Sequence, residues 1–253
     1  MSTGSSKALT ISVIVNIIAL LVIVYISYKA LEYRANVNTH LDRYNRVVEE
    51  FTSRDVYREA NRPLRSDTIV SSRVVFFGTT MTHDWPVEGQ FAGWEAINRG
   101  VAMQRLAGTV LRFRSDVIEL MPQAVVVEVS SYNFREPNTL DELREYTINM
   151  AELADYHGIV PILTTVIPPT EGYEPYESDY AVFDSLAVFN DWLTDWCTRK
   201  GFPVADFSAV MADEDGYIRE ELTTGGIIPN QQGYDALAEA VRQSLAELGQ
   251  SKN

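Results

Sequence analysis

Cysteine is almost absent from this chain of 253 residues, whose only thiol is Cys197. One thiol forms neither an internal disulfide nor a cysteine zinc cluster. Histidine is nearly as scarce, because His40, His83 and His157 are the only three. Neither these imidazoles nor the scattered carboxylates have the spacing of a metal site, so we expect no metal and no other cofactor. Any mechanism that requires an imidazole must use one of the three.

Basic residues are also in deficit. The chain has 21 Lys and Arg against 35 Asp and Glu, which gives a net charge of −14 at pH 7. The acidic excess lies after residue 60, whereas the first 60 residues are close to neutral. An acidic surface repels phosphate backbones, so we expect no nucleic-acid partner. The hydrophobic fraction of 46% is ordinary for a globular protein and excludes disorder over most of the chain.

Charged residues are absent between Lys7 and Lys29, and the residues between them, 8–28, are mostly apolar. A helix of that length rises about 30 Å, which is the thickness of the hydrocarbon core of a bilayer. A cleavable signal peptide has a shorter apolar run and a small-x-small cleavage site, which does not follow here. We therefore predict a transmembrane anchor over residues 1–29 and a single-pass membrane protein.

The segment after the anchor contains neither Gly nor Pro as far as Asn61, so we predict one helix from about Thr10 to about Ala60. Its charged part, residues 30–62, is a stalk with apolar residues at intervals of four and three, an a/d heptad seam. These residues are Val37, Leu41, Tyr44, Val48 and Phe51. Two interpretations stay open: self-association through a short coiled coil over residues 30–60, and one amphipathic helix that packs on its own globular domain.

After the stalk the sequence alternates between short apolar runs and helical stretches, so we interpret residues 63–253 as one domain. The predicted strands are Arg73–Gly78, Trp94–Gly100, Ala124–Ser130, Ile159–Val166 and Pro203–Phe207. The predicted helices are 106–120, 139–157, 183–196 and 230–248. This α/β alternation predicts a three-layer α/β/α sandwich with a five-stranded parallel sheet of flavodoxin-like order. Ligands of such sheets bind at the carboxyl ends of the strands.

Motifs at these strand ends, taken in order, resemble the sequence blocks of the SGNH/GDSL hydrolase family. The segments that resemble the first, second, third and last blocks are GTTMTHDWP at 78–86, INRGVAMQRLAGTVLRF at 97–113, PQAVVVEVSSYNF at 122–134 and TTGGIIPNQQGYDALAEAV at 223–241. Segments 162–170 and 189–207 fit a later strand and helix. The resemblance covers Val70 to Leu248, and it implies the family fold and an ester hydrolase chemistry on acylated carbohydrate or lipid.

The catalytic residues that the resemblance implies are replaced in this chain. Thr80 stands where the family has its nucleophilic Ser, and Thr79 stands at the preceding Asp. The Asp and His of the last block fall on Gly225 and Ile228. A hydroxyl nucleophile is inert at neutral pH without a base, and isoleucine neither takes nor gives a proton. We therefore predict that ester hydrolysis has been lost.

The oxyanion hole of the family is partly kept in the sequence. It combines the backbone N–H beside the nucleophile, the N–H of the second-block Gly and the side chain of the third-block Asn. Gly100 matches the Gly, whereas the Asn position falls on Tyr132, with Asn133 one residue later. We expect the N–H groups of Thr80 and Gly100 to remain, and the third donor to depend on Asn133.

One histidine lies close to the first block. His83 follows Thr80 by three residues and is a candidate replacement base, although the sequence favours an exposed or capping role. Asp84 beside it is interpreted as a solvated carboxylate at a helix start. His157 precedes a helix-ending Gly, and His40 lies in the stalk.

Aromatic residues near the expected cleft are candidates for ligand binding, because aromatic rings stack on sugars. The complete set of predicted ligand-binding residues is Thr80, Trp85, Gly100, Asn133 and Tyr173. Tyr132 and Tyr176 are further aromatic candidates at the same cleft.

Three functions stay open. The first is a membrane-anchored family member that has lost catalysis and acts as a binding or structural module, self-associating through its stalk. The second is a working esterase or acetylesterase with a rearranged site, and the third is a subunit whose missing catalytic residue comes from a partner. The basic residues beyond the anchor favour a cytoplasmic domain. The family resemblance implies an extracytoplasmic domain, which is the location we expect.

Overall fold

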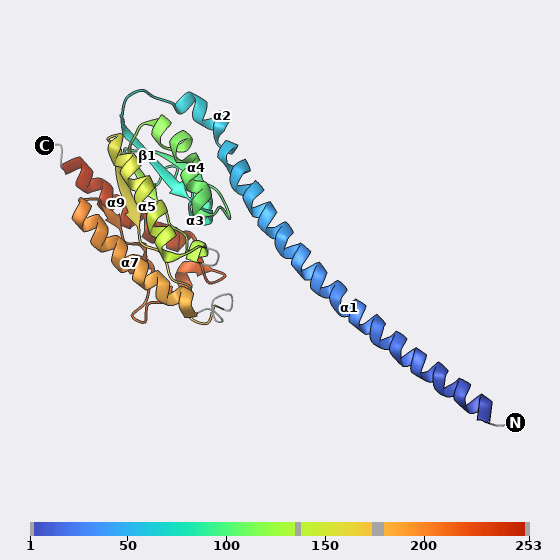
Figure 1. Cartoon of the computed structure of the whole chain (residues 1–253). Helices are drawn as coiled ribbons and strands as arrows, with labels where there is room; N and C mark the ends of the chain where they lie inside the picture. Colours follow the sequence, from blue (N-terminus) through green and yellow to red (C-terminus); the bar gives the residue numbers. More distant parts are fainter. Residues whose placement is uncertain (1–2, 135–137, 174–179, 251–253) are drawn as a thin grey trace. The chain divides into compact units, whose positions relative to one another are not determined.

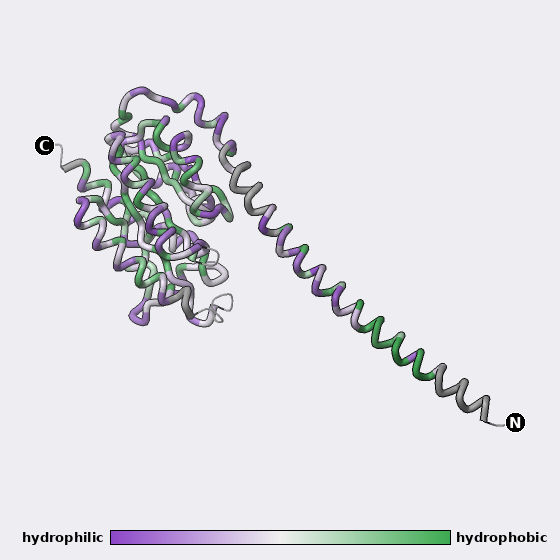
Figure 2. Tube along the Cα trace, viewed as in Figure 1, coloured by the Kyte–Doolittle hydropathy of each residue, from purple (hydrophilic) through white to green (hydrophobic). Residues whose placement is uncertain are grey.

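The computed structural model describes residues 3–134, 138–173 and 180–250, and the chain forms two compact units, Met1–Glu49 and Glu50–Asn253 (Figure 1). The first unit is helical and belongs to α1 (Thr3–Thr52). Its stretch Ser12–Leu41 is long and apolar enough to cross a membrane, and Figure 2 shows the apolar part in green. Length and composition of this kind also occur in signal sequences.

The N-terminal helix does not continue to Ala60 as predicted. α1 ends at Thr52, and a 3-10 turn, η1 (Ser53–Asp55), separates it from the short helix α2 (Arg58–Asn61). Thr, Ser and Asp follow one another closely here, and their side chains compete with the helix for backbone hydrogen bonds. The α-helical conformation ends again after Asn61, as the sequence predicts, because Pro63 lies in the first turn of the 3-10 turn η2 (Arg62–Leu64).

A five-stranded parallel sheet forms the centre of the second unit, with the order β2-β1-β3-β4-β5. The strands are β1 (Val70–Gly78), β2 (Glu95–Gly100), β3 (Pro122–Val127), β4 (Val160–Thr164) and β5 (Val204–Ala205). This is the predicted flavodoxin-like order, and each strand overlaps its predicted run. The strands are short in places: β5 keeps only two residues of the predicted 203–207.

Helices cover both faces of this sheet and complete the predicted α/β/α sandwich (Figure 1). They are α3 (Thr80–Asp84), α4 (Leu106–Asp116), α5 (Leu140–Tyr156), α7 (Tyr180–Lys200), α8 (Phe207–Met211) and α9 (Gln231–Gln250). Successive β1 side chains point to opposite faces. Val75 and Phe77 pack in one core with residues of α4, α5 and α7. Val74 and Phe76 pack in the other with residues of α8 and α9.

The remaining described elements are short. They are the 3-10 turns η3 (Ile118–Leu120), η4 (Ser131–Phe134) and η5 (Glu220–Leu222), and the two-stranded antiparallel hairpin of β6 (Thr223–Thr224) and β7 (Ile228–Pro229). The hairpin and η4 matter for function, because both carry residues that line the pocket described below.

The starts of α5 and α9 and the end of α5 lie at the residues that the sequence predicts. Thr139 and Glu142 form a capping box at the start of α5, and the hydrogen bond from the Thr139 backbone lowers the pKa of the Glu142 carboxyl. Gly158 ends the same helix at a φ of 73°, in the left-handed region that favours glycine. Asn230 Oδ1 accepts the N–H of Gly233 at 3.1 Å and caps α9.

Buried polar residues tie the segment after α1 into the second unit. Asn61 Nδ2 donates to Asp116 Oδ1 at 2.6 Å, and Arg99 Nε donates to Asn61 Oδ1 at 2.7 Å. Arg112, which is fully buried, donates to Asp116 Oδ2 at 2.9 Å and to the Gly78 carbonyl at 2.8 Å. The network reaches the end of β1, so the globular unit begins before residue 63, where the sequence analysis placed its boundary.

Candidate functional site

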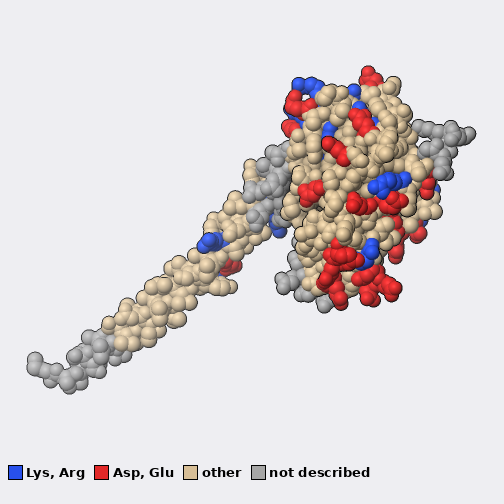
Figure 3. All heavy atoms as spheres, turned by 180° about the vertical axis from the view of Figure 1, so that it is seen from behind, with Lys and Arg blue, Asp and Glu red and all other residues tan. Residues whose placement is uncertain are grey.

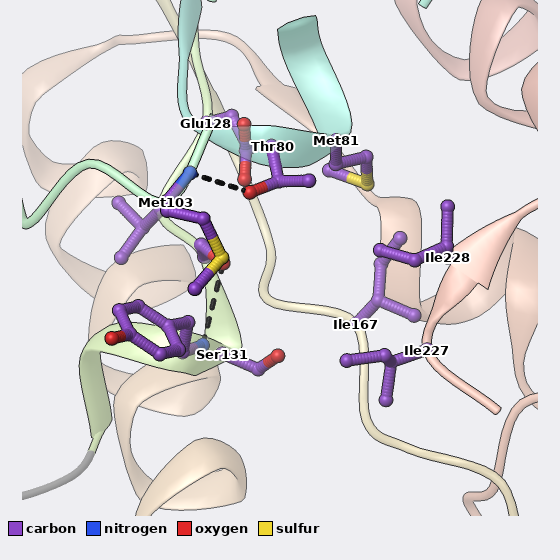
Figure 4. Close-up of a pocket in the computed structure, with 11 residues that line it drawn as sticks. Thr80, Met81, Met103, Glu128, Ser131, Ile167, Ile227 and Ile228 are labelled. Carbon is purple, nitrogen blue, oxygen red and sulfur yellow. Dashed lines mark hydrogen bonds between the residues drawn. The ribbon is translucent and has the colours of Figure 1, made fainter. Parts of the chain in front are cut away.

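A pocket opens beside Thr80, at the carboxyl ends of β1 and β3 (Figure 4). These two strands are neighbours, and the next strand in sequence after β1 lies on its other side. The pocket therefore lies at the topological switch point, where sheets of this kind bind ligands. Its cavity volume is about 110 Å³. The lining residues are Thr80, Met81, Met103, Glu128, Val129, Ser130, Ser131, Tyr132, Ile167, Ile227 and Ile228.

Thr80 is the first residue of α3, directly after the turn that leaves β1. Its Oγ1 accepts the backbone N–H of Met103 at 2.8 Å, one of the dashed bonds in Figure 4. Met103 has a φ of 60°, which is uncommon for a residue with a side chain. The loop after β2 thus holds the hydroxyl of Thr80, which we predicted at the nucleophile position.

An apolar wall faces Thr80 across the pocket. Ile227 and Ile228 come from the β6–β7 hairpin, and Ile167 lies beside them (Figure 4). Gly225 lies in the hairpin turn with a φ of 67°. Ile228, which we predicted at the position of the family His, therefore lines the same pocket as Thr80 and carries no proton-transfer group.

No histidine of the described chain lines this pocket. His83 Nδ1 lies 2.7 Å from Asp84 Oδ1, both side chains are about half exposed, and His83 lines a different hollow beside β2. Asp84 is the last residue of α3, so its expected place at a helix start is wrong. His157 forms the C-terminal cap of α5, and His40 lies in α1. The chain has no fourth imidazole.

Glu128 is the site residue that the sequence analysis missed. Its side chain is only 3% exposed, and its Oε2 accepts the N–H of Thr79 at 2.8 Å and that of Thr82 at 3.1 Å. The hydroxyls of the same two threonines also donate to it, Thr82 to Oε2 at 2.7 Å and Thr79 to Oε1 at 3.1 Å. The available signal was one charged residue inside the apolar run Ala124–Val129.

One of the three expected oxyanion donors is directed elsewhere. The Gly100 N–H donates to Asn98 Oδ1 at 2.7 Å, and an added Cβ at Gly100 would lie 2.1 Å from the backbone nitrogen of His83. Asn133 is fully buried and its Oδ1 accepts the N–H of Leu106 at 2.9 Å, whereas its Nδ2, the expected donor, has no hydrogen-bond partner among the described residues. Neither Gly100 nor Asn133 belongs to the lining of this pocket, and their part in ligand binding stays a prediction.

Of the aromatic residues predicted near the cleft, Trp85 and Tyr173 lie outside the pocket lining. Trp85 is 3% exposed and packs in the hydrophobic core, outside the lining of this pocket. Tyr173 lies outside the pocket lining, and its ring is close to Gly226, where an added Cβ would lie 2.6 Å from Tyr173 Cδ2. Tyr132 does line the pocket, and Tyr176 lies outside the described residues.

Neither a metal cluster nor a reactive thiol is found in the part of the chain that the structure describes. No three His, Cys, Asp or Glu side chains gather there as metal ligands. Cys197 is buried in α7, and burial raises the pKa of its thiol to about 12, so the thiolate is scarce at neutral pH.

Comparison with known proteins supports a common fold and family. Residues 77–236 match the model of the GDSL-like lipase/acylhydrolase family. A Bacteroides fragilis protein assigned as an acylhydrolase is 26% identical with a TM-score of 0.69, and the match covers 77% of this chain and 96% of that one. A GDSL-like lipase from Bacteroides thetaiotaomicron is 24% identical with a TM-score of 0.70, over 77% and 98%. No curated protein sequence matches.

Proposed function

The chain belongs to the GDSL-like lipase/acylhydrolase family, and we propose that it has lost ester hydrolysis and binds a ligand in the Thr80 pocket, held at a membrane by α1. The proposal rests on one observation, which is that Thr80 and Ile228 line the same pocket. The nucleophile position keeps a hydroxyl, and the base position holds an alkyl group. Catalytic residues of this type act as a unit, and loss of one removes a rate advantage on the order of 10⁴–10⁶.

Glu128 does not replace the missing base. Its carboxylate accepts four hydrogen bonds from Thr79 and Thr82, and the hydroxyl of Thr80 is bonded to the Met103 N–H instead. The hydrogen bonds to Glu128 hold the turn between β1 and α3. They support a structural and electrostatic role for this carboxylate.

The anchoring part of the proposal rests on α1. Its Ser12–Leu41 stretch has the length and apolarity of a membrane span, and the heptad seam, which begins at Val37 near the end of that stretch, supports self-association of the stalk. Known members of the family act mostly outside the cytoplasm, which supports an extracytoplasmic domain. We therefore propose a single-pass anchor that tethers the binding domain to the membrane.

The test uses the full chain in lipid nanodiscs with short acyl esters as substrates. We expect no hydrolysis above background for the parent, for Thr80→Ala, or for the matched control Thr194→Ala on the exposed side of α7. Hydrolysis by the parent and by Thr194→Ala, with none by Thr80→Ala at unchanged fold, would show an active site and overturn the proposal.

A working esterase is the second candidate, because Thr80 keeps the place of the nucleophile at the switch point of the sheet. The missing imidazole would then come from a second copy or another protein. In that case the rate per molecule rises with protein concentration, since the complete site exists only in the assembly. A rate strictly proportional to protein concentration argues against this candidate.

A further inference from the structure

We propose that the Thr80 pocket binds a primary aliphatic ammonium group, with Glu128 as its counter-ion. This inference rests on the proposed binding function of the same pocket and names the chemical class of its ligand. It follows from the charge of the lining, from the balance of hydrogen-bond donors and acceptors, and from the apolar wall.

The charge of the pocket is negative. Glu128 is the only carboxylate among the lining residues, and none of them is Lys, Arg or His. All four of its hydrogen bonds reach it as an acceptor, which is the pattern of an ionised carboxylate. Within the described residues it forms no ion pair. The nearby Arg112 interacts electrostatically with Glu128, but it is hydrogen-bonded to Asp116 and to the Gly78 carbonyl and does not line the pocket. A buried carboxylate of this kind favours a positively charged ligand.

The hydrogen-bond balance also favours an ammonium over an acyl oxygen. An ammonium has three donors and no acceptor. Glu128 Oε1 receives one hydrogen bond against three at Oε2, so it has room for a further donor. A carbonyl oxygen needs donors instead, and the backbone N–H groups of the lining residues Met103 and Tyr132 are taken by Thr80 Oγ1 and Ser130 Oγ.

The far wall of the pocket suits an aliphatic chain. Ile167, Ile227 and Ile228 lie opposite Thr80 and Glu128 in Figure 4, so a short alkyl chain can contact them while its charged end faces the carboxylate. Each buried methylene raises affinity about 4-fold. The cavity of about 110 Å³ limits the length, so affinity rises with the first methylenes of a primary amine and then stops rising.

Acidic side chains on the domain surface attract a cationic ligand toward the protein. Figure 3 shows many of them on one face, and the chain carries a net charge of −14. Such a field raises the local concentration of cations. It also attracts them without specificity, so a test must separate saturable binding in the pocket from loose association with the surface.

The experiment is calorimetric titration of the full chain in zwitterionic nanodiscs with n-butylammonium, n-butanol and n-butyrate at pH 7. We expect saturable 1:1 binding of n-butylammonium, at least about 10-fold stronger than n-butanol, and no binding of butyrate. Glu128→Gln weakens the binding at least about 10-fold, whereas Glu88→Gln, an exposed carboxylate outside this pocket, leaves it unchanged. Blocked lysine amide in place of n-butylammonium tells a lysine side chain from a free amine.

A second pair of variants tests amine binding in the pocket if Glu128→Gln fails to fold. Ile228→Lys places a tethered ammonium in the pocket, and Ile228→Met places a neutral chain of similar shape there. We expect both to be folded and Ile228→Lys alone to abolish n-butylammonium binding. Equal affinity for n-butanol and n-butylammonium, equal effects of Glu128→Gln and Glu88→Gln, or no saturable amine binding at millimolar concentration would each overturn the inference. The proposed loss of hydrolysis is tested separately, by Thr80→Ala.

Discussion

Glu128 holds Thr79 by two hydrogen bonds, from the Thr79 backbone N–H to Oε2 at 2.8 Å and from the Thr79 hydroxyl to Oε1 at 3.1 Å. The family motif has an aspartate at the position of Thr79. In this chain a carboxylate reaches the same turn from the end of β3 instead, and it also binds Thr82. We infer from the motif resemblance, which places an aspartate at Thr79, that Glu128 supplies the carboxylate of this turn.

The contact between Glu128 and Thr79 predicts that Thr79→Asp by itself strongly destabilises the protein. A second buried carboxylate would face that of Glu128 without a cation between them, at a cost of about 3–5 kcal/mol in the free energy of unfolding. Glu128→Leu alone also destabilises the protein, because the Thr79 N–H loses its acceptor. The double variant recovers at least about 2 kcal/mol of the summed loss. Chemical denaturation of the four proteins measures this coupling.

The control for this cycle is Thr147→Asp, at a buried threonine in α5 whose hydroxyl donates to a carbonyl of its own helix. It is expected to destabilise the domain, and Glu128→Leu is not expected to rescue it. Strict additivity of Thr79→Asp and Glu128→Leu would show that the two positions are independent.

The fold was predictable because local signals and tertiary packing agree. The valine-rich run of β3 and the polar residues at the start of α5 are visible in the sequence. The run favours a buried strand and Thr139 favours a helix start, and the structure has both. The end of α1 at Thr52 was not visible, because no Gly or Pro marks it. The segment after it is held by tertiary bonds, such as that of Asn61 to Asp116.

The candidate site was predictable only in part. The order of motifs identified Thr80 and Ile228, which line one pocket. Sequence could not place Trp85, because its burial depends on aromatic residues from distant segments, including Tyr234 in α9 at a ring distance of 5.6 Å. Glu128 was missed for the same reason, since its partners come from the neighbouring strand end.

Gly100 is predicted to be required because a side chain at this position does not fit beside the backbone of Thr82 and His83. Gly100→Ala would bring a Cβ within 2.1 Å of the His83 nitrogen and 2.5 Å of the Thr82 carbonyl carbon, which are backbone atoms that cannot rotate away. We expect a loss of about 3 kcal/mol in the free energy of unfolding. Gly225→Asn is the matched control, because its Cβ meets nothing within 4 Å and Asn tolerates a φ of 67°. Thermal unfolding compares the two, and equal losses would contradict the steric explanation.

The stalk seam is predicted to hold copies of the chain together. Leu41→Asp with Val48→Asp places carboxylates in an apolar seam, so we expect a lower oligomeric state and an unchanged globular domain. Thr39→Asp with Arg46→Asp, at positions that the heptad pattern places outside the seam, is the control and is expected to leave assembly intact. Light scattering of the protein in nanodiscs or mild detergent measures the mass, and a monomeric parent would show that the coiled-coil prediction is wrong.

The final prediction concerns the restoration of catalysis, and the pair of Thr79 and Glu128 determines its design. Thr80→Ser, Gly225→Asp and Ile228→His together return the nucleophile, the orienting acid and the base. Gly225 accepts the aspartate, because its Cβ direction is open and Asp tolerates the left-handed backbone. Thr79 must stay, since an aspartate there would oppose the Glu128 carboxylate.

We therefore expect the triple variant to hydrolyse short acyl esters about 10²-fold faster than the parent, at the low end of what a positioned general base contributes. The gain stays small because the Gly100 N–H remains bonded to Asn98 and is not free to stabilise an oxyanion. Addition of Thr79→Asp is expected to lower the rate by destabilising the turn that carries the nucleophile. The measurement is initial rate, with Thr80→Ala in place of Thr80→Ser as the inactive control. A quadruple variant faster than the triple would show that Glu128 does not occupy the family aspartate's place.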